Sequence, residues 1–172
     1  LLSGCGPRTQ PGQPIGEALD SLTADPLRAA RLDRPSTRVD TSYDRSGGND
    51  DYSYYLRRNG DWLVIADLEG PGILTRFWTT GVKNSQEFRF FFDGEKEARL
   101  DLTLADMRSG EMPFIRPLAR YEQSCLTSFA PIPFRERLRI EVKDDQYLMG
   151  KRKLYWQYSW RPLHPPPAGW PR

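Results

Sequence analysis

The segment that spans residues 42–51 holds the side chains best suited to bind a ligand. It combines carboxylates, a guanidinium group and an amide with two adjacent glycines, Gly47 and Gly48, which allow positive φ angles and a sharp turn. Such a mixture of hydrogen-bond donors and acceptors suits a neutral, hydroxyl-rich ligand such as a sugar. The candidate contact residues in the segment are Tyr43, Asp44, Arg45, Asn49, Asp50 and Asp51.

Two other interpretations of this segment stay open. In the first, the Asp and Asn side chains cap their own backbone in a solvated turn and bind nothing. In the second, the segment is a calcium loop. Its acidic spacing departs from the alternating EF-hand pattern, however, and it has no closing glutamate. The calcium interpretation is therefore the least favoured, and we expect neither a metal nor another cofactor.

The spacing of the acids favours recognition over catalysis. Asp50 and Asp51 are adjacent, and neighbouring side chains on an extended backbone point in opposite directions. The two carboxylates therefore cannot both face one bond of the ligand without a turn between them, and we assign them to hydroxyl recognition. The single histidine, His164, lies in a proline-rich tail and cannot build a zinc site or a conventional triad.

The composition indicates a β protein with one hydrophobic core. Hydrophobic residues make up 38% of the chain, aromatic residues 12% and charged residues 28%, which suffices for a core and is too little for a membrane span. The net charge of +2 is nearly neutral. Because no basic stripe is present to neutralise phosphates, we expect no nucleic-acid partner.

Short strands must position the candidate loop. Eight runs rich in β-branched and aromatic residues are separated by Gly, Pro, Asn and Asp, and Asn59-Gly60 and Asp93-Gly94 are hairpin signals. Apolar and charged residues alternate over residues 137–143, as in an antiparallel sheet with one wet face. The predicted strands are residues 52–56, 62–68, 73–80, 87–92, 98–102, 125–130, 138–142 and 154–160.

The remaining segments are predicted to be a tether, a helical segment and loops. Residues 15–32 are the only stretch with helical spacing, and Pro26 divides it into two short pieces. Residues 34–51 are predicted as a long polar loop and residues 107–121 as an excursion loop. The predicted domains are a tether at 1–16, an antiparallel β-sandwich with an N-terminal helical segment at 17–161, and a Pro-rich tail at 162–172.

Five motifs follow one another along the chain. They are Tyr43-Asp44-Arg45-Ser46-Gly47-Gly48-Asn49-Asp50-Asp51, Asp67-Leu68-Glu69-Gly70-Pro71-Gly72, Arg76-Phe77-Trp78, Phe92-Asp93-Gly94-Glu95 and Ser128-Phe129-Ala130-Pro131-Ile132-Pro133-Phe134. In this order and spacing they resemble the domain-of-unknown-function family 2961, which is classed as glycoside hydrolase family 172. The resemblance runs from about residue 18 to residue 160.

This resemblance implies an all-β jelly-roll fold and action on a glycan. Members of the family have two jelly-roll sandwiches per protomer, assemble into trimers or higher homo-oligomers, and act on fructofuranosyl or arabinofuranosyl linkages. A chain of 172 residues suits one domain and resembles the first half. The resemblance places the catalytic glutamates in a second sandwich, so no catalytic residue is assigned here. We expect a truncated substrate-holding half that is inactive alone; the alternative is a lipid-anchored, non-catalytic carbohydrate-binding or assembly module.

Either of two tryptophans could offer an aromatic face for the C–H side of a furanose ring. Trp62 adjoins the apolar strand residues Leu63 and Val64, which is more typical of a core position. Trp78 belongs to one of the matching motifs, and on that resemblance it joins the candidate site residues.

The first residues resemble a bacterial lipobox. Leu2-Ser3-Gly4-Cys5 places small residues before a cysteine that could be acylated, and a Gly- and Pro-rich tether follows. We therefore predict lipidation of Cys5, a membrane contact through that anchor alone, and a place in the bacterial cell envelope, on the outer membrane facing the periplasm or the exterior. Cys125, next to Leu126, is predicted to be a buried core cysteine.

Overall fold

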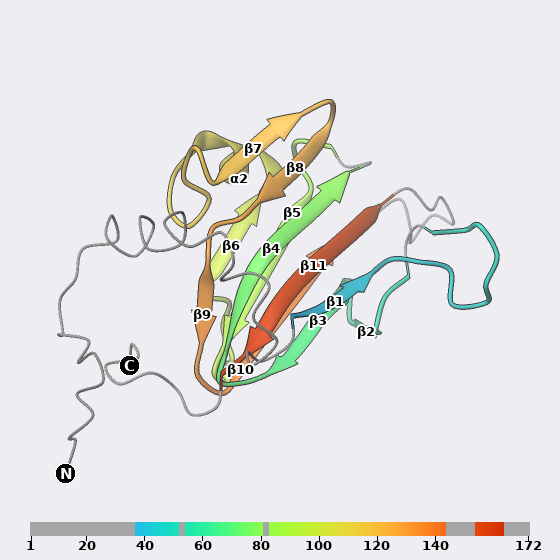
Figure 1. The fold of residues 1–172 in the computed structure, drawn as a ribbon, viewed down its shortest axis with the longest axis horizontal. Coiled ribbons are helices and arrows are strands. Elements are labelled where there is room, and N and C mark those ends of the chain that lie inside the picture. Colours follow the sequence, from blue (N-terminus) through green and yellow to red (C-terminus); the bar gives the residue numbers. More distant parts are fainter. Residues whose placement is uncertain (1–36, 52–53, 81–82, 144–153, 164–172) are drawn as a thin grey trace, which may run out of the picture. The chain divides into compact units, whose positions relative to one another are not determined.

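The computed structural model describes residues 37–51, 54–80, 83–143 and 154–163, and these residues form two antiparallel sheets packed as a sandwich (Figure 1). The predicted all-β class is therefore confirmed. The predicted helical segment at 15–32, the tether with Cys5 and the tail with His164 lie outside the described residues. Within the described residues, no helix has the length and apolar character needed to cross a membrane.

The first sheet, sheet A, has the order β1-β11-β4-β8-β7, and β9 pairs with β4. Its long central pair is β4 with β11, and β1 lies at the edge (Figure 1). The strands are β1 (Arg38–Thr41), β4 (Gly72–Thr80), β7 (Ala119–Glu122), β8 (Cys125–Ser128), β9 (Ile132–Phe134) and β11 (Tyr155–Pro162).

The second sheet, sheet B, has the order β2-β3-β10-β5-β6. A short helix, α2 (Leu104–Ser109), follows β6 and begins with a capping box between Thr103 and Asp106. The strands are β2 (Arg57–Asn59), β3 (Trp62–Glu69), β5 (Glu87–Phe92), β6 (Leu100–Thr103) and β10 (Arg137–Lys143).

Phenylalanine side chains fill the space between the sheets. Phe77 of β4 makes edge-to-face contacts with Phe88 and Phe90 of β5, at centroid distances of 5.9 and 6.1 Å. Phe114, in the loop after α2, contacts Phe90 in the same way. All four are fully buried, and replacing such a ring by alanine costs about 3–5 kcal/mol.

Three of the family motifs meet at one corner of the sandwich. A Cβ added to Gly72 would lie 2.6 Å from the ring of Phe134, and one added to Gly70 would lie 2.7 Å from the carbonyl oxygen of Arg135. Asp93, in the β5–β6 turn with φ of 50°, accepts backbone N–H groups of residues 135–137 through Oδ1. Burial raises the pKa of Asp93, but these hydrogen bonds outweigh it, so the pKa lies below its usual value. These motifs therefore fix the fold.

Several predictions about single elements were wrong. Part of the predicted polar loop at 34–51 is strand β1, which exists because its backbone pairs with β11. The excursion loop at 107–121 contains the end of α2 and the start of β7. In the first predicted strand, at 52–56, the described residues 54–56 are not strand, and β2 begins at Arg57. The hairpin turn at Asn59-Gly60 is confirmed, since Asn59 pairs with Trp62 across it.

Two side chains predicted to be buried lie on outer faces. Leu63 pairs with Val142 inside the sandwich, so Trp62 points outward and is half-buried. Cys125 is also half-buried and points away from the core, because its neighbour Leu126 fills the inward position of β8. In both cases the adjacent apolar residue occupies the core side of the strand.

Candidate functional site

The candidate loop begins where β1 ends at the edge of sheet A, and it extends beyond the strand ends (Figure 1). Ser42 ties it to the core. Its N–H donates to the carbonyl of buried Trp156 at 2.9 Å, and its hydroxyl donates to the carbonyl of Asp51 at 2.6 Å. Both ends of the loop are thus held by one serine, which itself is anchored on β11.

Asp44 organises the interior of the loop. Its side chain is only 6% exposed, and its carboxylate accepts hydrogen bonds from the N–H and hydroxyl of Ser46, the N–H of Asp50 and the hydroxyl of Tyr54, at 2.7–3.1 Å. Hydrogen bonds from Ser46, Tyr54 and Asp50 hold the pKa of Asp44 well below its ordinary value. Asp51 contributes in the same way, since its Oδ1 accepts the N–H of Asp44 at 3.0 Å.

The two glycines of the loop meet different requirements. Gly47 has φ of 79°, a left-handed conformation that favours glycine. Gly48 has no room for a side chain, because a Cβ there would lie 2.5 Å from Oδ2 of Asp44. The prediction that this pair allows a sharp, close-packed turn is therefore confirmed.

An arginine and a tyrosine form the exposed wall of the loop. The guanidinium of Arg45 stacks 3.7 Å above the ring of Tyr43 and donates to Tyr43's carbonyl at 2.7 Å and to Asp40 at 3.1 Å. Tyr43 keeps 51% of its surface exposed. Such a stack offers a fixed aromatic edge and a fixed array of N–H donors to a ligand. Asn49 and Asp50 are also exposed, on the part of the loop that returns to Asp51.

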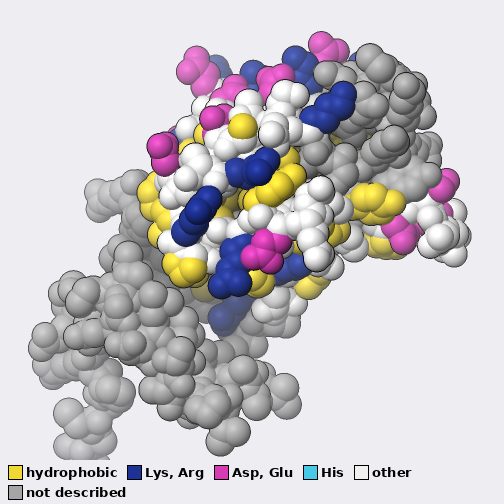
Figure 2. Space-filling view, turned by 90° about the horizontal axis from the view of Figure 1, so that it is seen from above, with side chains coloured by type: hydrophobic (Ala, Val, Ile, Leu, Met, Phe, Trp, Pro, Cys, Tyr) yellow, Lys and Arg dark blue, Asp and Glu magenta, His cyan; other side chains and the backbone are white. Residues whose placement is uncertain are grey.

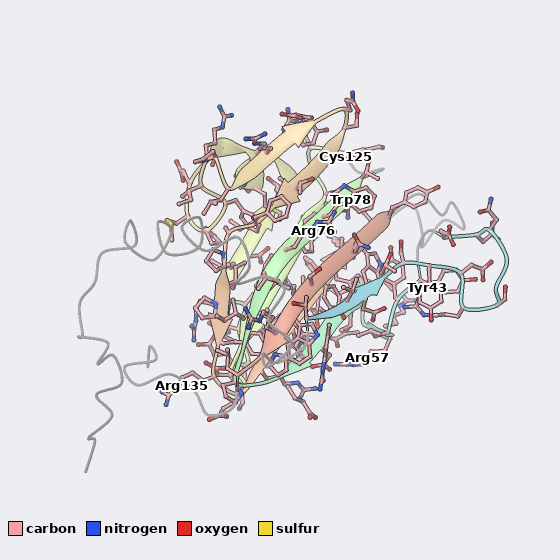
Figure 3. All side chains as sticks on the ribbon, viewed as in Figure 1. Tyr43, Arg57, Arg76, Trp78, Cys125 and Arg135 are labelled. Carbon is pink, nitrogen blue, oxygen red and sulfur yellow. The ribbon has the colours of Figure 1, made fainter. Side chains whose placement is uncertain are left out.

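Trp78 lies on the outer face of sheet A, because its neighbours Phe77 and Thr79 are buried inside. It is aligned with Gln157 of β11, and Gln157 is aligned with Thr41 at the end of β1. With strands about 4.8 Å apart, the backbone of Trp78 is about 10 Å from the residue at which the loop begins. Figure 3 shows this arrangement, with Trp78 on β4 and Tyr43 beyond β11.

Two residues between Trp78 and the loop were not predicted from the sequence. Tyr155 begins β11 opposite Thr80 and is 37% exposed, and Gln157 accepts a hydrogen bond from the guanidinium of Arg76. Their signal was present in the alternation of β11, where Trp156 and Tyr158 are buried and the residues between them face outward. The outer face of sheet A therefore carries Tyr155 between Trp78 and the loop.

The described residues provide no group of three or more His, Cys, Asp or Glu side chains placed to hold a metal ion. In the loop, Asp44 and Asp51 instead accept hydrogen bonds from the loop itself. Viewed from above, the described surface shows Lys and Arg side chains interspersed with Asp and Glu side chains and with apolar and uncharged groups (Figure 2). The arrangement suits contacts with uncharged, hydroxyl-bearing rings.

Fold and site together define a β-sandwich domain with an aromatic and polar surface beside one edge strand. The model of the first β-sandwich domain of glycoside hydrolase family 172 matches residues 34–167, and the chain belongs to this family. The resemblance seen in the sequence motifs is thereby confirmed. A comparison with curated proteins gave no match.

The predicted site residues fall into two groups. Tyr43, Arg45, Asn49 and Asp50 are exposed on the loop, and Trp78 is half-buried on the neighbouring sheet face. Asp44 and Asp51 have side-chain roles inside the loop. That these residues contact a glycan remains a prediction.

Proposed function

We propose that this domain holds the substrate of a family 172 glycoside hydrolase that acts on furanosides, with the catalytic carboxylates supplied by a second sandwich. The observation that carries the proposal is the internally hydrogen-bonded loop: Asp44 accepts hydrogen bonds in its interior, while Tyr43, Arg45, Asn49 and Asp50 are exposed. A preformed set of donors and acceptors lowers the entropic cost of binding hydroxyl groups. The furanoside class rests on the family resemblance.

The acids of the loop support a holding role over a catalytic one. Asp44 is surrounded by donors that favour its ionised form, so it cannot donate a proton at neutral pH. Asp51 accepts the backbone N–H of Asp44, which fixes its orientation toward the loop. A glycosidase requires one protonated acid and one carboxylate on either side of the scissile bond. The proposal therefore takes this pair from a second sandwich.

The outer face of sheet A supports contact with a second sandwich or another subunit. Val39, Phe129 and Tyr155 are exposed there, and Trp78 lies among them. Apolar surface of this kind is stabilised when it is covered, by about 25 cal/mol per Å². This face also favours the second candidate function, a non-catalytic carbohydrate-binding or assembly module anchored to the cell envelope through Cys5.

Titration calorimetry of the whole chain with arabinofuranosyl and fructofuranosyl oligosaccharides tests the proposal. Asp50→Asn and Trp78→Ala should each weaken binding at least about tenfold, the loss of one good polar or stacking contact, with little change in melting temperature. A large loss of thermal stability without a change in affinity would support a structural role. Hydrolysis of an aryl arabinofuranoside by this chain alone would contradict the holding role.

A further inference from the structure

A hollow lies on the outer face of sheet B, on the opposite side of the sandwich from the candidate site. Its volume is about 530 Å³, and it lies over β3, β10, β5 and the β5–β6 turn. Small-molecule sites occupy about 300–1,000 Å³. The loop at 42–51 and Trp78 belong to sheet A, so the hollow is separate from the candidate site described above.

A buried carboxylate forms the floor of this hollow. Glu141 is on the outward side of β10, yet it is only 1% exposed. Its Oε1 accepts the amide of Asn59 at 2.8 Å and lies 3.0 Å from Nε of Arg139. That Nε is buried, but its N–H does not point at this oxygen well enough for a hydrogen bond and has no other partner among the described residues. A charge-paired carboxylate and an unsatisfied buried donor thus lie side by side under the hollow.

A β-bulge lies opposite Glu141. Its extra residue, Ile65, is on β3, and Glu141 keeps the outward position that the alternation of β10 gives it. The register of β10 against β3 shifts between Ile140 and Glu141, so that Ile140 pairs with Ala66 while Glu141 pairs with Val64. Bulges are frequent next to binding sites. The two core neighbours of Glu141 on β10, Ile140 and Val142, are fully buried, so the bulge leaves the packing of the interior intact.

Stacked planar groups form the walls. Arg89 stacks 3.9 Å above the ring of Trp62 and is oriented by Asp101, 2.9 Å from its Nε. Arg139 stacks 4.1 Å above Phe91. Arg139 of β10 lies over a ring of the neighbouring strand β5, whereas Arg89 of β5 reaches across β10 to the half-exposed Trp62 of β3. The walls therefore combine fixed N–H donors with apolar ring edges.

The charges of the hollow balance, which identifies the class of ligand. Arg89, Arg139 and Lys96 face Asp101, Glu97 and Glu141. A phosphate or another anion would meet as many carboxylates as cations, and an apolar ligand would leave these charges unsatisfied. A neutral ring with many hydroxyl groups can donate to carboxylates, accept from guanidinium and amide groups and stack on an indole.

We propose that the outer face of sheet B is a second binding site for neutral saccharides, formed by Trp62, Arg89, Asp101, Arg139, Glu141 and Asn59. It is non-catalytic and independent of the loop on sheet A. The proposal goes beyond the proposed function, because it stands on the composition and geometry of this hollow even if the loop binds no glycan. A glycan chain or a second glycan would be held there at a distance from the first site.

Two tryptophan substitutions give a matched pair. Trp62 and Trp78 are both half-buried on outward strand positions, but of different sheets. Saturation-transfer NMR and tryptophan fluorescence would follow the whole chain with arabinotriose, inulotriose and cellotriose, with trigalacturonate as the charged control. Trp62→Ala should lower the affinity for a neutral trisaccharide at least tenfold, and Trp62→Phe should restore part of it. Binding at Trp62 should persist in the Trp78→Ala variant.

The substitutions distinguish the site on sheet B from the proposed function of the loop. Loss of binding in Trp62→Ala alone, with Asp50→Asn and Trp78→Ala unaffected, supports the second site and contradicts the proposed function of the loop. The reverse result overturns the second site and leaves the loop proposal standing. Tighter binding of trigalacturonate than of every neutral trisaccharide overturns the ligand class. Should Trp62→Ala fail to fold, Asp101→Asn replaces it; unchanged binding of neutral trisaccharides in a folded Asp101→Asn variant overturns the proposal.

Discussion

The two outer faces of this sandwich share one core but differ in chemistry. On sheet A, the apolar side chains of Val39, Phe129, Tyr155 and Trp78 stand at outward positions. On sheet B, four ion pairs among the described residues join outward side chains of neighbouring strands, and a fifth, Arg139–Glu141, lies within β10. Sheet A is therefore suited to be covered, whereas sheet B is suited to remain in contact with water or with a polar ligand.

The two sides of the sandwich also differ in the partners of their most extensively hydrogen-bonded acids. On sheet B, Asp67 accepts Arg137 in a bidentate pair at 2.6 and 2.7 Å, and it also contacts Arg57 at 2.6 Å. Beside sheet A, the acid that accepts a comparable number of hydrogen bonds is Asp44. Its donors are neutral groups of Ser46, Asp50 and Tyr54. One acid joins three strands, and the other shapes a single loop.

The largest effect is expected from breaking the network on sheet B. Asp67→Ala leaves two arginines without their shared carboxylate and should reduce the free energy of unfolding by about 1–3 kcal/mol. Urea denaturation of the variant and of the wild type measures this. The exposed pair Arg58 and Asp61 provides the matched control, because Asp61→Ala removes a carboxylate 3.8 Å from its partner. Equal losses in both variants would contradict the structural role of Asp67.

The same acid predicts a pH dependence. Burial raises the pKa of Asp67, but hydrogen bonds and charge interactions with Arg137 and Arg57 outweigh it, so the folded pKa lies below its usual value. The network therefore stabilises the fold above the unfolded pKa of about 3.9 and is lost as the pH falls through the folded pKa. In Asp67→Asn, this pH-dependent part of the free energy of unfolding should be absent. If the free energies of unfolding of the wild type and of Asp67→Asn change in parallel between about pH 5 and about pH 2, this role of Asp67 is contradicted.

A smaller, local effect is expected in the loop beside sheet A. Asp44→Ala removes the acceptor of the amides of Ser46 and Asp50, so both amides should exchange with solvent faster. Hydrogen exchange followed by NMR measures this, with the amides of β5 as an internal reference. Asp50→Asn is the matched control, because residue 50 is exposed and the substitution keeps the size of its side chain. Unchanged exchange at Ser46 would mean that the loop is held mainly by Ser42.

The strands could be predicted from the sequence because their alternation is strong. β3, β4, β5, β10 and β11 were predicted to within two residues at each end. β1 was missed because its residues, Arg38 to Thr41, have no apolar alternation, and only pairing with β11 makes them a strand. Trp62 and Cys125 were misplaced because an apolar neighbour in a strand occupies the opposite face.

The candidate site could be predicted only in composition. The mixture of acids, amide and arginine around Gly47 and Gly48 marked the loop, and the structure confirms the turn. Which acidic side chains point into the loop depends on the path of the turn. The sequence alone therefore could not tell that Asp44 is buried and Asp50 exposed. The hollow on sheet B was not predicted, because Asn59, Arg89 and Glu141 are brought together only by strand pairing.

Making the face of sheet A more polar should change association more than stability. The double substitution Tyr155→Ser and Phe129→Ser removes two exposed rings and should lower binding of a hydrophobic dye and any self-association. Dye fluorescence and sedimentation velocity of the whole chain measure this. On sheet B, Trp62→Ala serves as the control and should leave both readouts nearly unchanged. If dye binding instead falls equally in the control, the two faces do not differ in the way proposed.

The smallest effect is expected from a single exposed ion pair on sheet B. Lys143 and Glu87 lie 3.4 Å apart, with both side chains more than a third exposed. Because such pairs are screened by water and salt, Lys143→Ala should change the free energy of unfolding by less than about 0.5 kcal/mol, and less still in 1 M salt. Urea denaturation at two salt concentrations measures this. A loss above about 1 kcal/mol would mean that the charged face supports the core as strongly as buried contacts do, and that solvation alone does not separate the two faces.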